Sequence, residues 1–222
     1  MSERSVTDLP FDAWVRWLFC QSGDDPAWHW DVAGDRVELE PAQVVAFTTK
    51  LFEDAGALLA AYQDSQVNHG LWFLINEGGP LRALADNSVA LGRRMDCIRS
   101  MTTLFEQCFV PRCTPHLSHL SEPGAGPLNP VCYMWWDIFP LCPEPDDPAR
   151  REIDAACLSV MATTLQLPSI PCQESALHGL GHWGFAYEAR CQNIISTFLH
   201  RNADMRAVLR DYALRAREKN VN

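Results

Sequence analysis

Small residues recur at helical spacing in the segment 174–182, which reads Glu-Ser-Ala-Leu-His-Gly-Leu-Gly-His. A glycine inside a helix costs about 1 kcal/mol relative to alanine, so Gly179 and Gly181 indicate a face that a neighbouring helix approaches closely. A second His-Gly-Leu triplet occurs at 69–71. Two such segments in a chain without sustained apolar and polar alternation predict stacked helical hairpins, an architecture used mainly for binding.

Most long segments share one pattern, in which apolar residues recur every three or four positions and predict amphipathic helices. These segments are 10–20, 41–55, 64–76, 81–85, 93–109, 148–165, 172–187, 189–200 and a last helix capped by Asn202. We therefore expect an all-α protein of about 8–10 helices in a single domain, 1–222. The stretch 27–40 is the one place where a short strand pair is arguable.

Two long irregular loops, 111–130 and 140–148, interrupt this pattern. Between them lies a dense apolar block, 131–141, whose side chains are too aromatic to be left in water. Loops of such length are uncommon in compact domains and are often functional.

The segment 171–200 resembles a HEAT or armadillo-type repeat, on the strength of the small residues of its first helix and the apolar residues of its second. These are Ala176, Gly179 and Gly181, followed by Ile194, Ile195, Phe198 and Leu199. Residues 64–85 are similar. The resemblance implies an α-solenoid with HEAT-like hairpins that binds a protein or peptide on its concave face, and it supplies no catalytic residues. Because the two loops break the repeat, an irregular helical bundle stays open as the alternative.

The formal net charge of −10 argues against nucleic acid as a partner, since attraction to phosphates depends on clustered Lys and Arg. Residues 1–64 carry twelve acidic and four basic side chains, whereas the chain from Arg201 onward carries six basic and three acidic ones. An acidic N-terminal lobe of this kind could receive a basic protein. A solvated acidic surface that only confers solubility is the alternative interpretation.

The nine cysteines include no Cys-x-x-Cys pair and fall on apolar helix faces, so we expect reduced thiols. The chain has no uninterrupted run of about 18 apolar residues, so its sequence predicts no membrane-spanning helix. The N-terminus has neither the basic nor the apolar region of a signal peptide. A cytoplasmic protein is the expectation.

Two histidine constellations are candidate metal sites. Cys113, His116 and His119 place three potential zinc ligands within seven residues of an irregular loop. Glu174, His178 and His182 lie at i, i+4 and i+8 on one helix face, where two histidines four apart can bind one divalent ion. The alternative for both is structural: loop histidines that cap helix ends or meet solvent, and core histidines hydrogen-bonded to backbone.

The chain lacks the motifs of several enzyme classes. It has no His-Glu-x-x-His, no Gly-x-Ser-x-Gly and neither glycine-rich nucleotide signature, so no reaction is identified.

An aromatic segment is the candidate recognition site. It comprises Tyr133, Trp135, Trp136 and Asp137. Adjacent helical residues point about 100° apart, so the two tryptophans cannot both face one small core, and we expect one of them near a surface or groove. Core packing is the alternative.

The leading functional hypothesis is a protein–protein interaction module without a cofactor. Within that class, a protein that neutralises or scaffolds a basic partner, such as an immunity protein for a toxin, fits the charge and the size. The alternative is a metal-dependent enzyme or small-ligand binder, with zinc held by clustered His and Cys in a helical pocket.

Overall fold

The fold is all-α, as predicted. The computed structural model describes residues 9–20, 37–76 and 78–221, and in these ranges the chain forms α-helices with short 3₁₀ and π segments and no β-strand. The α-helices are α1 Phe11–Phe19, α2 Pro41–Glu53, α3 Ala55–Leu59, α4 Asp64–Ile75, α5 Leu91–Leu104, α6 Val110–Arg112, α7 Asn129–Met134, α8 Arg151–Thr164, α9 Ile170–Trp183, α10 Glu188–Arg201 and α11 Ala207–Arg217. The other segments are η2 Pro80–Ala85, η3 Phe105–Phe109 and η4 Ser118–Leu120.

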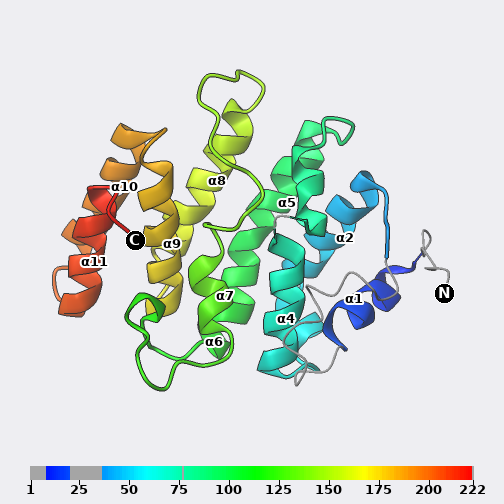
Figure 1. Cartoon of the computed structure of the whole chain (residues 1–222), viewed down its shortest axis with the longest axis horizontal. Coiled ribbons are helices and arrows are strands. Elements are labelled where there is room, and N and C mark those ends of the chain that lie inside the picture. The colour runs from blue at the N-terminus through cyan, green and yellow to red at the C-terminus, as the bar shows by residue number, and fades with distance from the viewer. Residues whose placement is uncertain (1–8, 21–36, 77, 222) are drawn as a thin grey trace.

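The helices stand side by side in an elongated row that runs from α1 at one end to α10 and α11 at the other (Figure 1). Along this row α2 packs on α5, α5 on α8, α8 on α9, and α9 on α11. One core of buried apolar residues extends through the row from Phe11 to Val221. None of the helices in the described ranges is long and apolar enough to cross a bilayer.

Two predictions fall partly outside the described residues. The strand pair expected over 27–40 falls mostly on 21–36, which also holds Asp24, Asp25, Asp31 and Asp35 of the acidic N-terminal lobe. Both therefore stay predictions.

Several helix ends differ from the sequence prediction. Pro111 does not stop the helix after 93–109, because the chain passes through the π segment η3 and continues to Arg112. Proline has no backbone N–H to donate, and the changed hydrogen-bond spacing of the π turn accommodates the missing donor. Asn202 ends α10 instead of starting the last helix, since its Nδ2 donates to the Phe198 carbonyl at 2.9 Å. The last helix begins at Ala207.

Helix α9 is buried on nearly all sides, because α7, α8, α10 and α11 all pack against it. Its glycines make this possible. A Cβ on Gly179 would lie 2.6 Å from the Trp136 Cβ, and one on Gly181 would lie 2.4 Å from a Val221 methyl. The close packing predicted from the small residues of α9 is confirmed, but the groups that approach these glycines belong to the turn after α7 and to Val221 beyond α11, not to a neighbouring helix. The contact at Gly179 brings the turn after α7 against the middle of α9.

Candidate functional site

Two histidines of α9 and one aspartate of the turn after α7 form the candidate site. The His182 Nε2 atom lies 3.3 Å from the His178 Nε2 atom and 3.3 Å from the Asp137 Oδ1 atom. All three ligand atoms lie within 4.8 Å of one another, and no other group of three His, Cys, Asp or Glu in the described ranges is as close. His178 is buried, while His182 and Asp137 are partly open to solvent.

These separations fit a common metal ion. Zinc binds imidazole nitrogen and carboxylate oxygen at about 2.0–2.2 Å, and two ligands at that distance in a tetrahedron are about 3.3–3.6 Å apart. The His182 Nε2 atom lies at this distance from both the His178 Nε2 atom and the Asp137 Oδ1 atom. Three protein ligands leave one tetrahedral position open, which is the arrangement of zinc sites that bind a further molecule.

Tyr212 of α11 fixes the His178 ring through the ring nitrogen that does not face His182. The His178 Nδ1 atom shares a hydrogen bond of 2.7 Å with the Tyr212 hydroxyl. Burial and the neighbouring Tyr133 hydroxyl raise the pKa of Tyr212, which keeps that phenol neutral. Burial lowers the pKa of His178 to about 3, so the ring is neutral at physiological pH and its Nε2 can serve as a ligand.

Glu174, predicted as the third ligand, does not join the two histidines. It is fully buried, and its carboxylate accepts hydrogen bonds from the backbone N–H groups of Ser118 and His119, both at 2.9 Å. The same carboxylate lies 2.6 Å from the His119 Nδ1 atom. A helix rises 1.5 Å per residue, so Glu174 and His182 are about 12 Å apart along the axis, too far to share one ion.

Cys113, His116 and His119, the other predicted ligand set, point to three different partners. The Cys113 thiol interacts with the buried thiol of Cys132. The His116 Nδ1 atom lies 3.0 Å from the Thr114 hydroxyl, and His119 pairs with Glu174. The set forms no close ligand group in the described ranges, because the loop is ordered by internal hydrogen bonds that turn its side chains apart.

Trp135 and Trp136 are both buried, so the prediction that one lies near a surface is wrong. The Trp135 ring contacts Phe52, Phe105 and Phe109, whereas Trp136 packs on Gly179 and Phe139. The two rings fill different parts of the core, because this short segment is covered by helices on both sides. Of the aromatic segment, Tyr133 and Asp137 reach the site.

A cavity of about 310 Å³ opens beside the site. Its lining consists of His119, Leu120, Tyr133, Met134, Asp137, His178, Arg215 and Val221. The His119 ring stacks on Tyr212 with centroids 4.0 Å apart, which holds it at the wall. A cavity of this size suits a small ligand.

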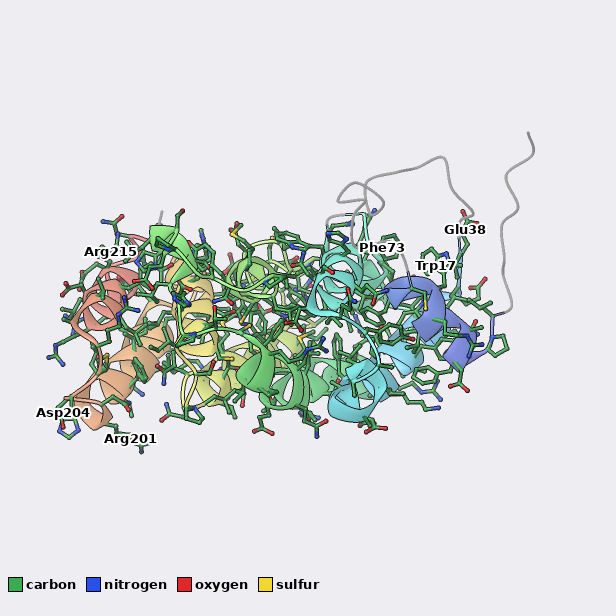
Figure 2. All side chains as sticks on the ribbon, turned by 90° about the horizontal axis from the view of Figure 1, so that it is seen from below. Trp17, Glu38, Phe73, Arg201, Asp204 and Arg215 are labelled. Carbon is green, nitrogen blue, oxygen red and sulfur yellow. The ribbon has the colours of Figure 1, made fainter. Side chains whose placement is uncertain are left out.

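A larger cavity of about 590 Å³ lies at the other end of the row, where Trp17 and Phe73 meet edge to face. Figure 2 shows Trp17, Phe73 and Glu38 at that end, far from Arg215. Its lining residues 37–39 and 78–80 border residues outside the described ranges. It contains no group of potential metal ligands in the described part of the chain.

Two residues of the site, Tyr212 and Arg215, were not found from sequence. Tyr212 follows Leu209 by three positions in the last helix, a spacing that indicates a buried apolar stripe, and both residues are buried. Nothing in that spacing points to His178 as its hydrogen-bond partner. Arg215 carried no local signal at all, since an exposed arginine on a helix is ordinary.

Comparison with known proteins returns no match: neither the protein-family models, nor the curated proteins, nor the solved structures include one similar to this chain.

Proposed function

We propose that this protein binds a divalent transition metal ion, zinc in the first instance, through Asp137, His178 and His182, and presents it to a small ligand in the adjoining cavity. The observation that carries this proposal is the convergence of three ligand atoms within 4.8 Å of one another. The His182 Nε2 atom lies 3.3 Å from each of the other two, and His178 and Asp137 stand on the wall of an open cavity. Imidazole and carboxylate together suit Zn²⁺ and Fe²⁺.

Metal titration against a chromophoric chelator tests the proposal. The wild-type protein should bind one zinc ion per chain. Asp137→Asn and His182→Gln should each weaken zinc binding by at least about 100-fold, and Tyr212→Phe, which removes the partner of His178, by about 10-fold or more. Asp137 and His182 are partly exposed, so these two variants should fold.

His200→Gln is the matched control, because His200 is exposed on α10 and lies outside the cavity. It should bind zinc as tightly as the wild type. Stoichiometric zinc binding that survives in both Asp137→Asn and His182→Gln would place the ion elsewhere, and the absence of binding to the wild type would overturn the proposal.

An interaction module is the second candidate function, supported by the elongated row of helices and by an exposed aromatic side chain (Figure 1). Phe185, in the turn between α9 and α10, is 74% exposed. We propose that α9 and α10 form a HEAT-like hairpin, and that a basic protein contacts this end through Phe185. The described part of the acidic N-terminal lobe, α1 and α2, lies at the other end of the row, so a partner that the lobe steers must extend along the row (Figure 1). The nine free thiols support a cytoplasmic setting.

Pull-down with wild-type and Phe185→Ser baits tests this second candidate. A partner retained by the wild type should be lost with Phe185→Ser, and its association rate should fall as salt rises. Trp136 is not an anchor for such a partner, because it is buried. A partner whose association rate does not depend on salt would exclude electrostatic steering.

A further inference from the structure

Arg215 of α11 lies at the cavity beside the metal-ligand group. Its guanidinium sits over the Tyr212 ring, 5.2 Å from the ring centroid, and Tyr212 in turn holds the His178 ring. One buried side chain therefore sets the position of both the metal ligand and the arginine. This cation–π contact orients the guanidinium without using its hydrogen-bond donors.

Arg215 differs from arginines that serve the fold. Arg112 pairs with Asp64, Arg150 with Asp154, and Arg206 with Glu122. Within the described ranges Arg215 has neither a carboxylate partner nor a hydrogen-bond acceptor. Its five donors are thus free to face a ligand, and their planar fork matches the oxygens of carboxylate and phosphate.

The charges around the cavity favour an anion once a divalent ion is bound. Asp137, the carboxylate on the cavity wall, neutralises only part of the ion's charge. The Glu174 carboxylate is buried and turned to the backbone of Ser118 and His119, so it does not compete for Arg215. The cavity then presents an ion with an open position and a free guanidinium on its wall.

We infer that the cavity takes a small oxyanion ligand, a carboxylate or a phosphate, which places one oxygen on the metal and others on Arg215. This inference rests on the metal site proposed above and adds the chemical class of its ligand. The volume of about 310 Å³ limits the ligand to a small molecule.

Cobalt(II) substitution separates the two proposals in one experiment. The protein is first loaded with Co²⁺, whose visible absorption reports its ligands, and then titrated with inorganic phosphate and, in a second arm, with acetate. At least one anion should change the cobalt spectrum of the wild type in a saturable way. Arg215→Gln should weaken that anion by at least about 10-fold while cobalt affinity stays unchanged.

Arg210→Gln is the matched control, because Arg210 is exposed on the same helix and is not part of the cavity. It should bind the anion as the wild type does. A response to phosphate alone or to acetate alone identifies which oxyanion the site prefers. A cobalt spectrum that neither anion changes, or equal anion affinity in wild type and Arg215→Gln, overturns this inference and leaves the metal site standing. Failure to bind cobalt overturns the metal site itself, and the inference with it.

Discussion

Gly179→Ala is expected to loosen the contact that brings Asp137 to the histidines. The added Cβ would lie 2.6 Å from the Trp136 Cβ and 2.7 Å from its Cγ, where ordinary contact is 3.4–4 Å. Both atoms are close to the backbone of residue 136, so the ring cannot rotate out of the way. The turn that carries Trp136 and Asp137 must retreat from α9 by about 1 Å.

Two opposing terms set the size of the effect. Overpacking in a core costs about 1–3 kcal/mol, and the inflexible contact with Trp136 points to the upper end. Replacing a helical glycine with alanine returns about 1 kcal/mol. The net loss of unfolding free energy is then about 2 kcal/mol, or a fall in Tm of about 4–8 °C for a chain of this length.

Thermal unfolding followed by circular dichroism measures this loss, and zinc titration measures the retreat of Asp137. Gly92→Ala is the control: Gly92 also lies in a helix, but a Cβ there meets no atom within 4 Å. It should raise the unfolding free energy by about 0.4–1 kcal/mol. If Gly179→Ala stabilised the protein as Gly92→Ala does, the close approach of the turn to α9 would be refuted.

Three further outcomes are expected. Burial lowers the pKa of His178 to about 3, so between pH 6.5 and pH 3 this histidine is protonated in the unfolded state but not in the folded state. The contribution of His178 to the unfolding free energy of the metal-free protein should therefore be greatest above pH 6.5 and should fall by up to about 1.4 kcal/mol per pH unit towards pH 3. His178→Gln should remove this slope in urea titrations across pH, whereas His200→Gln should keep it. Asn129→Ala should lower the unfolding free energy in urea by about 3 kcal/mol and make the loop 113–128 sensitive to proteases, because the buried Asn129 amide forms hydrogen bonds with the backbone of Thr114, His116 and Gly126. A loop that stays resistant to proteases in this variant would contradict the prediction. Arg112→Met should lower the unfolding free energy by about 2 kcal/mol in thermal melts, since Arg112 donates to the carbonyls of Leu59 and Tyr62; an unchanged Tm would show that these bonds add nothing.

The sequence by itself determined the helices and the character of α9. Apolar spacing is a local property, since each turn of helix repeats it, and so α2, α4, α5 and α10 could be located from residues alone. The glycines of α9 predicted a close neighbour without any knowledge of which segment it would be. A glycine lowers the stability of a helix, so it is expected in a helix mainly where a larger side chain would not fit. His178 and His182 could likewise be placed on one face of one helix.

Only the tertiary structure decided what meets that face. Asp137 reaches the histidines because the turn after α7 packs on Gly179, a contact between segments far apart in the chain. Glu174, on the same face of α9, does not join the histidines because its buried carboxylate accepts hydrogen bonds from the backbone N–H groups of Ser118 and His119.

The two tryptophans show the same limit. A rule about directions around one helix could not foresee that helices cover this segment on both sides and bury Trp135 and Trp136 in different parts of the core. Spacing along a chain fixes which way side chains point relative to one another. Which groups they meet depends on contacts between distant segments, and those are set by the packing of the whole core.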